Sequence, residues 1–178
     1  EVLNNYADYL REYKIDNNKS LENYVRCMVY LSKNEQDLLK DPVHIGYSLS
    51  LAEAGDPLKA LETIQSVLYS DYEKNQGTGT YDNPSIETIK PDKKSLKVLK
   101  TKYKILWDIY RRSPDQKTLI AASNTSELIV SLLEKVRINI SEEESRLILG
   151  DRYKDSYLNA IRDFNLLYNK TADYQYME

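Results

Sequence analysis

The chain of 178 residues has little cysteine, histidine, glycine or proline: one Cys, one His, five Gly and five Pro. A single cysteine, Cys27, cannot form an internal disulfide, which fits a reducing compartment. A single histidine, His44, excludes a His-rich metal site. No apolar run approaches the ~18–20 residues that a membrane-spanning helix requires, and no basic-then-apolar signal opens the chain. We therefore expect no membrane segment, no metal and no cofactor.

Neither sign of charge dominates, because 25 Lys and Arg stand against 28 Asp and Glu, for a net charge of -3. Nucleic-acid binding needs a dense positive field, so nucleic acid is not the expected partner. Nearly all of the aromatic residues are tyrosines: the chain has 16 Tyr, one Phe and one Trp. A tyrosine can bury its ring while its hydroxyl reaches water or a polar group, which suits thin helical layers.

Apolar residues recur every three or four positions, which is the period of an α-helix and not the alternation of a strand. The pattern predicts a single all-α domain over 1–178, with helical hairpins over about 1–40, 41–72 and 92–138 and terminal helices over about 142–169. The stretch 73–91 has no apolar stripe and contains Gly77, Gly79 and Pro84. We expect a surface loop there, and a frayed tail after Asn169.

Helix boundaries follow from capping residues. Asp56-Pro57 is typical of a helix start, because Asp caps free backbone N–H groups and Pro fits the first turn, and Gly55 is a natural end for the preceding helix. Asp41-Pro42 is interpreted in the same way. Other expected boundaries are a turn over 16–18, capping boxes at Ser113–Gln116 and at Ser141 with Glu144, and a break at Gly150-Asp151.

The helix expected over 92–112 carries two apolar stripes. One stripe contains Leu96, Leu99, Tyr103, Leu106 and Tyr110, and the other contains Val98, Ile105 and Ile109. A helix that is apolar on two faces lies between neighbours, as in a stacked array. We therefore expect the hairpins to stack in a right-handed α-solenoid that a C-terminal helix closes.

Residues 45–61 resemble a tetratricopeptide repeat. The Gly55-Asp56 turn is followed by the small residue Ala60, which allows the second helix to approach the first closely. Ile64 and Leu68 then follow at helical spacing.

A second resemblance covers roughly 41–168. The segments 95–107, 110–112, 128–137, 141–147 and 157–161 are similar to the helical region that precedes the caspase-like protease domain of bacterial CHAT proteins, and Ser-Glu-Glu-Glu-Ser-Arg at 141–146 is the most telling part. The resemblance implies a tetratricopeptide scaffold in a bacterial, cytoplasmic protein that also carries a protease. It implies that the partner is a protein or peptide, with an adjacent protease domain of the same polypeptide as one candidate. The protease's His and Cys belong to a mixed α/β domain, so no catalytic residue is carried over to this chain.

Basic residues form one stripe of the helix over 92–112. The stripe contains Lys93, Lys97, Lys100, Lys104 and Arg111. It is either an ordinary solvated face or an electropositive strip that docks an acidic peptide or a neighbouring domain. Tyr47, Tyr103 and Tyr110 are interpreted either as exposed rings that grip a partner or as packing residues.

The charged residues of 142–146 and the pair Cys27 and His44 are candidate functional residues that a structural role can also explain. The carboxylates of 142–144 suit a helix start, where the helix dipole favours negative charge, and Glu144 completes a cap. We expect Arg146 to pair with a carboxylate or with helix-end carbonyls. Cys27 and His44 are the only thiol and imidazole available for a nucleophile–base pair, but a mid-helix Cys is usually a buried packing residue.

These observations together favour a non-catalytic protein–protein interaction scaffold. The alternative is a helical domain that binds a small ligand or a glycan on tyrosine platforms, which would show a Tyr-lined pocket with converging polar groups. A hydrolase that uses Cys27 and His44 is a third interpretation.

Overall fold

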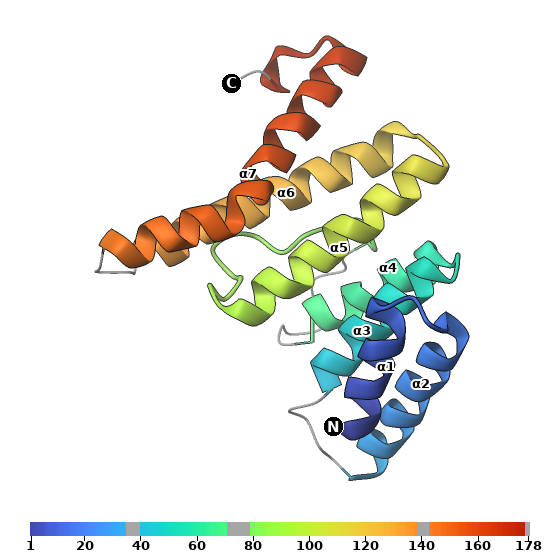
Figure 1. Ribbon diagram of the computed structural model, residues 1–178. Helices are drawn as coiled ribbons and strands as arrows, with labels where there is room; N and C mark the ends of the chain where they lie inside the picture. The colour runs from blue at the N-terminus through green and yellow to red at the C-terminus, as the bar shows by residue number, and fades with distance from the viewer. Residues whose placement is uncertain (35–39, 71–78, 139–142, 177–178) are drawn as a thin grey trace. The chain divides into compact units, whose positions relative to one another are not determined.

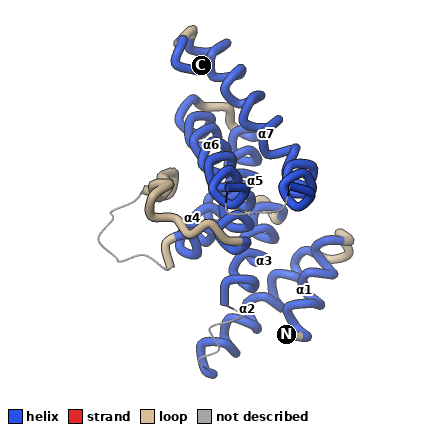
Figure 2. Tube along the Cα trace, turned by 90° about the vertical axis from the view of Figure 1, so that its left-hand side faces the viewer, coloured by secondary structure: helices blue, strands red, loops and turns tan. Residues whose placement is uncertain are grey.

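The computed structural model describes the backbone of residues 1–34, 40–70, 79–138 and 143–176. All regular secondary structure in these ranges is helical, which confirms the all-α prediction (Figures 1 and 2). The elements are α1 (Val2–Glu12), α2 (Asn17–Asn34), α3 (Lys40–Glu53), α4 (Pro57–Leu68), α5 (Lys93–Arg112), α6 (Gln116–Ile138), α7 (Glu143–Thr171) and the 3-10 helix η2 (Tyr174–Tyr176). Among these helices, none combines the length and the apolar character that crossing a membrane would need.

The chain divides into two compact units, Glu1–Lys74 and Asn75–Glu178. The first unit holds α1–α4 and the second holds α5–α7 with η2. The sequence predicted a single domain over 1–178. That prediction remains untested, because a division into two compact units does not show whether they fold as one domain.

In the first unit each helix packs against the next one along the chain. The helix α4 begins as expected, because the Asp56 carboxylate accepts a hydrogen bond from the Lys59 amide at 3.1 Å and Pro57 occupies the first turn. Gly55 has a φ of 100°, a left-handed conformation that favours glycine. Ala60 is fully buried, as close approach of two helices requires.

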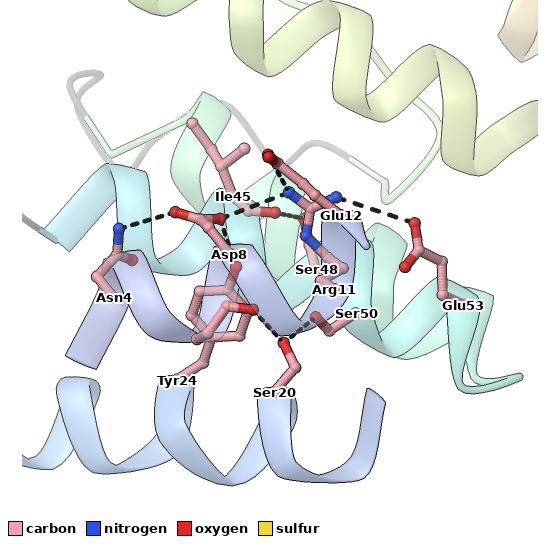
Figure 3. Close-up of polar contacts among 11 residues, drawn as sticks. Asn4, Asp8, Arg11, Glu12, Ser20, Tyr24, Ile45, Ser48, Ser50 and Glu53 are labelled. Carbon is pink, nitrogen blue, oxygen red and sulfur yellow. Dashed lines mark hydrogen bonds and ion pairs between the residues drawn. The ribbon is translucent and has the colours of Figure 1, made fainter. Parts of the chain in front are cut away.

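A polar network joins α1, α2 and α3 around Tyr24 (Figure 3). The fully buried Tyr24 donates its hydroxyl to the carboxylate of Asp8. Arg11 pairs with the same carboxylate at 3.4 Å. Below them, the Ser20 hydroxyl donates to the carbonyl of Ala7 at 2.9 Å and lies 3.1 Å from the Ser50 hydroxyl. Because these hydrogen bonds join side chains and a carbonyl of three helices, the network helps to fix how the three helices pack.

Three expected helix starts differ from the structure. The helix α2 already begins at Asn17, because Asp16 acts as the cap and accepts a hydrogen bond from the Lys19 amide at 2.9 Å. The helix α6 begins at Gln116, where the Asp115 carboxylate accepts from the Thr118 amide at 2.8 Å, so the capping box expected at 113–116 is wrong. The helix α3 begins at Lys40, which places Asp41 within its first turn.

The last helix also differs from the expectation. The helix α7 runs without interruption over Glu143–Thr171, so the break expected at Gly150-Asp151 is wrong. A glycine inside a helix costs only about 1 kcal/mol, and α7 is also held by its packing against α6. Ser141 lies outside the described residues, as do the side chains of Glu144 and Arg146.

In the second unit α6 packs against both α5 and α7. Both apolar stripes predicted for α5 are buried. Residues 79–91 contain no helix, as predicted, but Pro84 and Ile89 are buried, so the segment is packed against the unit. The tail is not frayed as expected, because η2 turns back at Ala172 and the Tyr176 ring lies 6.4 Å from that of Phe164.

Candidate functional site

The basic stripe predicted on α5 is exposed. Its members are Lys93, Lys97, Lys100, Lys104 and Arg111. The Lys100 ammonium lies 5.0 Å from the centre of the Tyr153 ring of α7, and Arg111 pairs with Asp108 of its own helix. The stripe therefore borders α7 at Lys100.

Side chains of α5 and α7 meet along a line that we call the α5–α7 seam, defined by Tyr103, Trp107, Arg162 and Asp163. The Asp163 carboxylate is fully buried and accepts hydrogen bonds from the Tyr103 hydroxyl at 2.8 Å and from the Trp107 indole at 3.4 Å. Arg162 donates to the Tyr103 oxygen at 2.6 Å, and its guanidinium lies 4.3 Å from the Trp107 ring centre. The seam is thus an ordered polar core with a cation on its outer side.

Burial shifts the ionisation of this core. Burial raises the pKa of Asp163, although hydrogen bonds from Tyr103 and the charge of Arg162 oppose that rise. Burial also raises the pKa of Tyr103, and the neighbouring Asp163 charge acts in the same direction. Tyr103 is therefore a hydrogen-bond donor at neutral pH and not a phenolate.

Replacing Asp163 with Asn should destabilise the second unit. The amide cannot supply the acceptor set that Tyr103, Trp107 and Arg162 use, so a buried network is left partly unpaired. We expect the free energy of unfolding in urea to fall by about 1–3 kcal/mol. Asp155→Asn, at an exposed position of the same helix, is the control and should change stability by less than about 0.5 kcal/mol. Equal stability of the two variants would contradict a structural role for the seam.

Cations line the seam on both helices. Lys100 and Lys104 of α5 are exposed, as is Lys170 of α7, whose ammonium lies 5.1 Å from the Tyr110 ring centre. The Arg162 side chain is 53% exposed even though it bonds to Tyr103. The Asp163 carboxylate is fully buried among its donors. The accessible charge next to the half-buried Trp107 is therefore positive, which suits an acidic partner.

The three candidate tyrosines, Tyr47, Tyr103 and Tyr110, differ in how far they are exposed. Tyr103 and Tyr110 are only 8% and 7% exposed, so of the two interpretations the packing one holds for both. Tyr47 lies in the first unit, half-buried, beside a hollow of about 380 Å³ whose walls include Val25 and Arg26.

Sequence reasoning missed the contribution of α7, namely Arg162, Asp163 and Lys170. A signal was present, because Asp163 falls at helical spacing between the buried Ala160 and Leu167. A carboxylate on an inward stripe indicates a buried partner.

The thiol of Cys27 and the imidazole of His44 lie on α2 and α3 of the first unit. Cys27 is buried, and burial raises the pKa of its thiol, which disfavours the thiolate. The His44 Nδ1 atom lies 2.7 Å from the Lys40 carbonyl within its own helix. In the part of the chain that the structure describes, no three His, Cys, Asp or Glu side chains gather as a metal site would require.

The comparisons with known proteins assign no family to the chain. No family model matches it, and neither a curated protein nor a solved structure gives a significant match. The tetratricopeptide and CHAT resemblances therefore rest on this chain's own residues alone.

Proposed function

We propose that the chain is a non-catalytic protein–protein interaction scaffold. Its hairpins form a right-handed tetratricopeptide-like solenoid in which contact surfaces, and not bond-breaking groups, perform the function. The support is the all-helical architecture, the capped turn at Gly55-Asp56 and the buried Ala60.

The resemblance to CHAT proteins suggests where the scaffold belongs. We propose that it is the recognition or regulatory region of a bacterial, cytoplasmic protein with a caspase-like protease domain. The partner is then that protease domain or a separate protein that controls it. The coding sequence next to this region should encode a mixed α/β domain with a His and a later Cys. Neighbouring sequence without such a domain would contradict this assignment and leave the contact surface itself unaffected.

The observation that carries the proposal is the positive surface of α5 and α7. Its cations are Lys93, Lys97, Lys100, Lys104, Arg111, Arg162 and Lys170. Single exposed ion pairs contribute about 0–1 kcal/mol each, so recognition needs several of them together with the apolar contact that Trp107 offers. Complementary charge also accelerates encounter with an acidic partner. We therefore expect the partner segment to be rich in Asp and Glu.

Charge reversal tests this surface. The triple variant Lys97→Glu, Lys100→Glu and Lys104→Glu should weaken binding of a fluorescent oligo-glutamate peptide by about tenfold or more, measured by anisotropy at about 50 mM NaCl. Raising the salt should weaken binding to the unmodified chain, because exposed charges are screened.

The matched control carries the same change of net charge in the first unit. Lys14, Lys33 and Lys59 are exposed there, and all three are changed to Glu. This control should retain most of the affinity. An equal loss in both variants would show that only net charge matters, and the α5 surface would then not be a specific contact site.

A further inference from the structure

A polar hollow lies in the second unit, away from the residues of the α5–α7 seam. It has a volume of about 500 Å³ and lies between the segment 81–86 and the middle of α6. Small-molecule sites typically have volumes of about 300–1,000 Å³. Its walls include Tyr81 and Asp82 on one side and Asn124, Glu127 and Ser131 of α6 on the other.

The α6 wall presents unused polar groups. Asn124, Glu127 and Ser131 follow helical spacing of three and four, so they share one face of α6. Within the described ranges, none of these three side chains has a hydrogen-bond or ion-pair partner, whereas the neighbouring Thr125 hydroxyl donates to the Ala121 carbonyl at 2.7 Å. An amide, a carboxylate and a hydroxyl are therefore all available to a ligand.

The opposite wall is held in place before any ligand arrives. The Lys102 Nζ atom donates to the Asp82 carbonyl and, at 2.9 Å, to the Asn83 side-chain oxygen. Lys135 donates to the Ile86 carbonyl at 2.6 Å. The Asn83 amide also donates to the Thr125 hydroxyl at 3.1 Å. Because these bonds order the segment, ligand binding does not incur the cost of ordering it.

The charges around the hollow offset one another. Carboxylates of Asp82 and Glu127 line it, while Lys135 anchors its wall and the Lys117 ammonium lies 4.6 Å from the Tyr81 ring centre. A ligand of either net charge would therefore meet repulsion from one of these sets. The amide of Asn124 and the hydroxyl of Ser131 can each donate and accept a hydrogen bond. Ligand hydroxyls have the same dual capacity, so they match these groups.

We propose that this hollow binds a neutral polyhydroxylated ligand, a single sugar residue. The Glu127 carboxylate accepts from ligand hydroxyls, and Asn124 and Ser131 both donate and accept. The inference is independent of the proposed scaffold function, because it uses a different surface of the unit. The hollow is open to solvent, so the expected dissociation constant is about 1–10 mM.

Saturation-transfer NMR tests the inference on the full chain. The probes are methyl β-glucoside, methyl β-galactoside and N-acetylglucosamine, each at about 20 mM, with putrescine as a cationic probe. At least one sugar should show saturation transfer, and Glu127→Ala should reduce its affinity by about tenfold. Ser131→Leu, which places a larger apolar side chain in the wall of the hollow, should have the same effect. Glu62→Ala, at an exposed position of α4, is the matched control and should leave binding unchanged.

Three results would overturn the inference. Saturation transfer to none of the sugars would remove the ligand class, and so would transfer to putrescine alone. Sugar binding that persists in both Glu127→Ala and Ser131→Leu would place the site elsewhere. Circular dichroism of each variant checks that the helices remain intact.

Discussion

Replacing Gly46 with Ala is expected to lower the free energy of unfolding of the first unit by about 1.5–5 kcal/mol. A Cβ at this position would lie 2.5 Å from the hydroxyl oxygen of Tyr24 and 2.6 Å from two of its ring carbons. Tyr24 is fully buried and hydrogen-bonded to Asp8, so it has no free space to move into. Overpacking of this kind costs about 1–3 kcal/mol. The lost hydrogen bond to a charged acceptor adds about 1.5–3 kcal/mol, and the better helix propensity of Ala returns about 1 kcal/mol.

A double-mutant cycle shows whether the clash is the cause. Tyr24→Leu removes the ring and the hydroxyl, so adding Gly46→Ala to it should cost less than Gly46→Ala costs alone. Urea denaturation followed by circular dichroism measures all four chains. If the losses of unfolding free energy in the two single variants simply add in the double variant, a clash with Tyr24 is not the reason that position 46 needs glycine.

Lys102 should make stability depend on pH. Burial lowers the pKa of Lys102 to about 7 in the folded chain, while the Asp82 charge opposes this change. The unfolded chain keeps the ordinary value of 10.5, so between these values it binds a proton that the folded chain does not. Stability contributed by this group must therefore rise with pH across that window, by up to about 2 kcal/mol between pH 7 and pH 9.

The comparison of two methionine variants isolates this effect. Lys102→Met removes the titrating group and should lose the rise between pH 7 and pH 9. Lys97→Met, at an exposed position of the same helix, should keep it. Urea denaturation at both pH values gives the two slopes. Identical slopes in the Lys102→Met variant and the unmodified chain would show that Lys102 is not desolvated in the folded state.

Local signals predicted much of the fold. Asp56, Pro57 and Gly55 act through backbone groups within four residues, so their effect is visible in the sequence alone. The apolar period likewise predicted α5 and the end of α6. The errors at Ser113 and Gly150 are local as well, since Asp115 is a competing cap and a single glycine does not end a packed helix.

Other features depend on residues that are distant in the sequence. Lys102 is buried only because the carbonyl of Asp82 and the amide of Asn83 reach it from a segment about 20 residues away. Asp163 is buried only because Tyr103 and Arg162 meet it between two helices. The exposed lysines of α5 could be predicted from spacing. On α7, spacing places Asp163 on the inward stripe, but it does not show which residues of α5 Asp163 meets, because the pairing of two helices leaves no local signal.

Trp107 provides the most direct test of recognition by the positive surface. It is the one tryptophan of the chain and lies half-buried in the α5–α7 seam, so its indole N–H gives a single NMR resonance. Titration with an oligo-glutamate peptide should shift this resonance in a saturable way, and the shift should disappear in the Lys97→Glu, Lys100→Glu and Lys104→Glu variant. An indole resonance that stays fixed while the peptide binds would contradict the account.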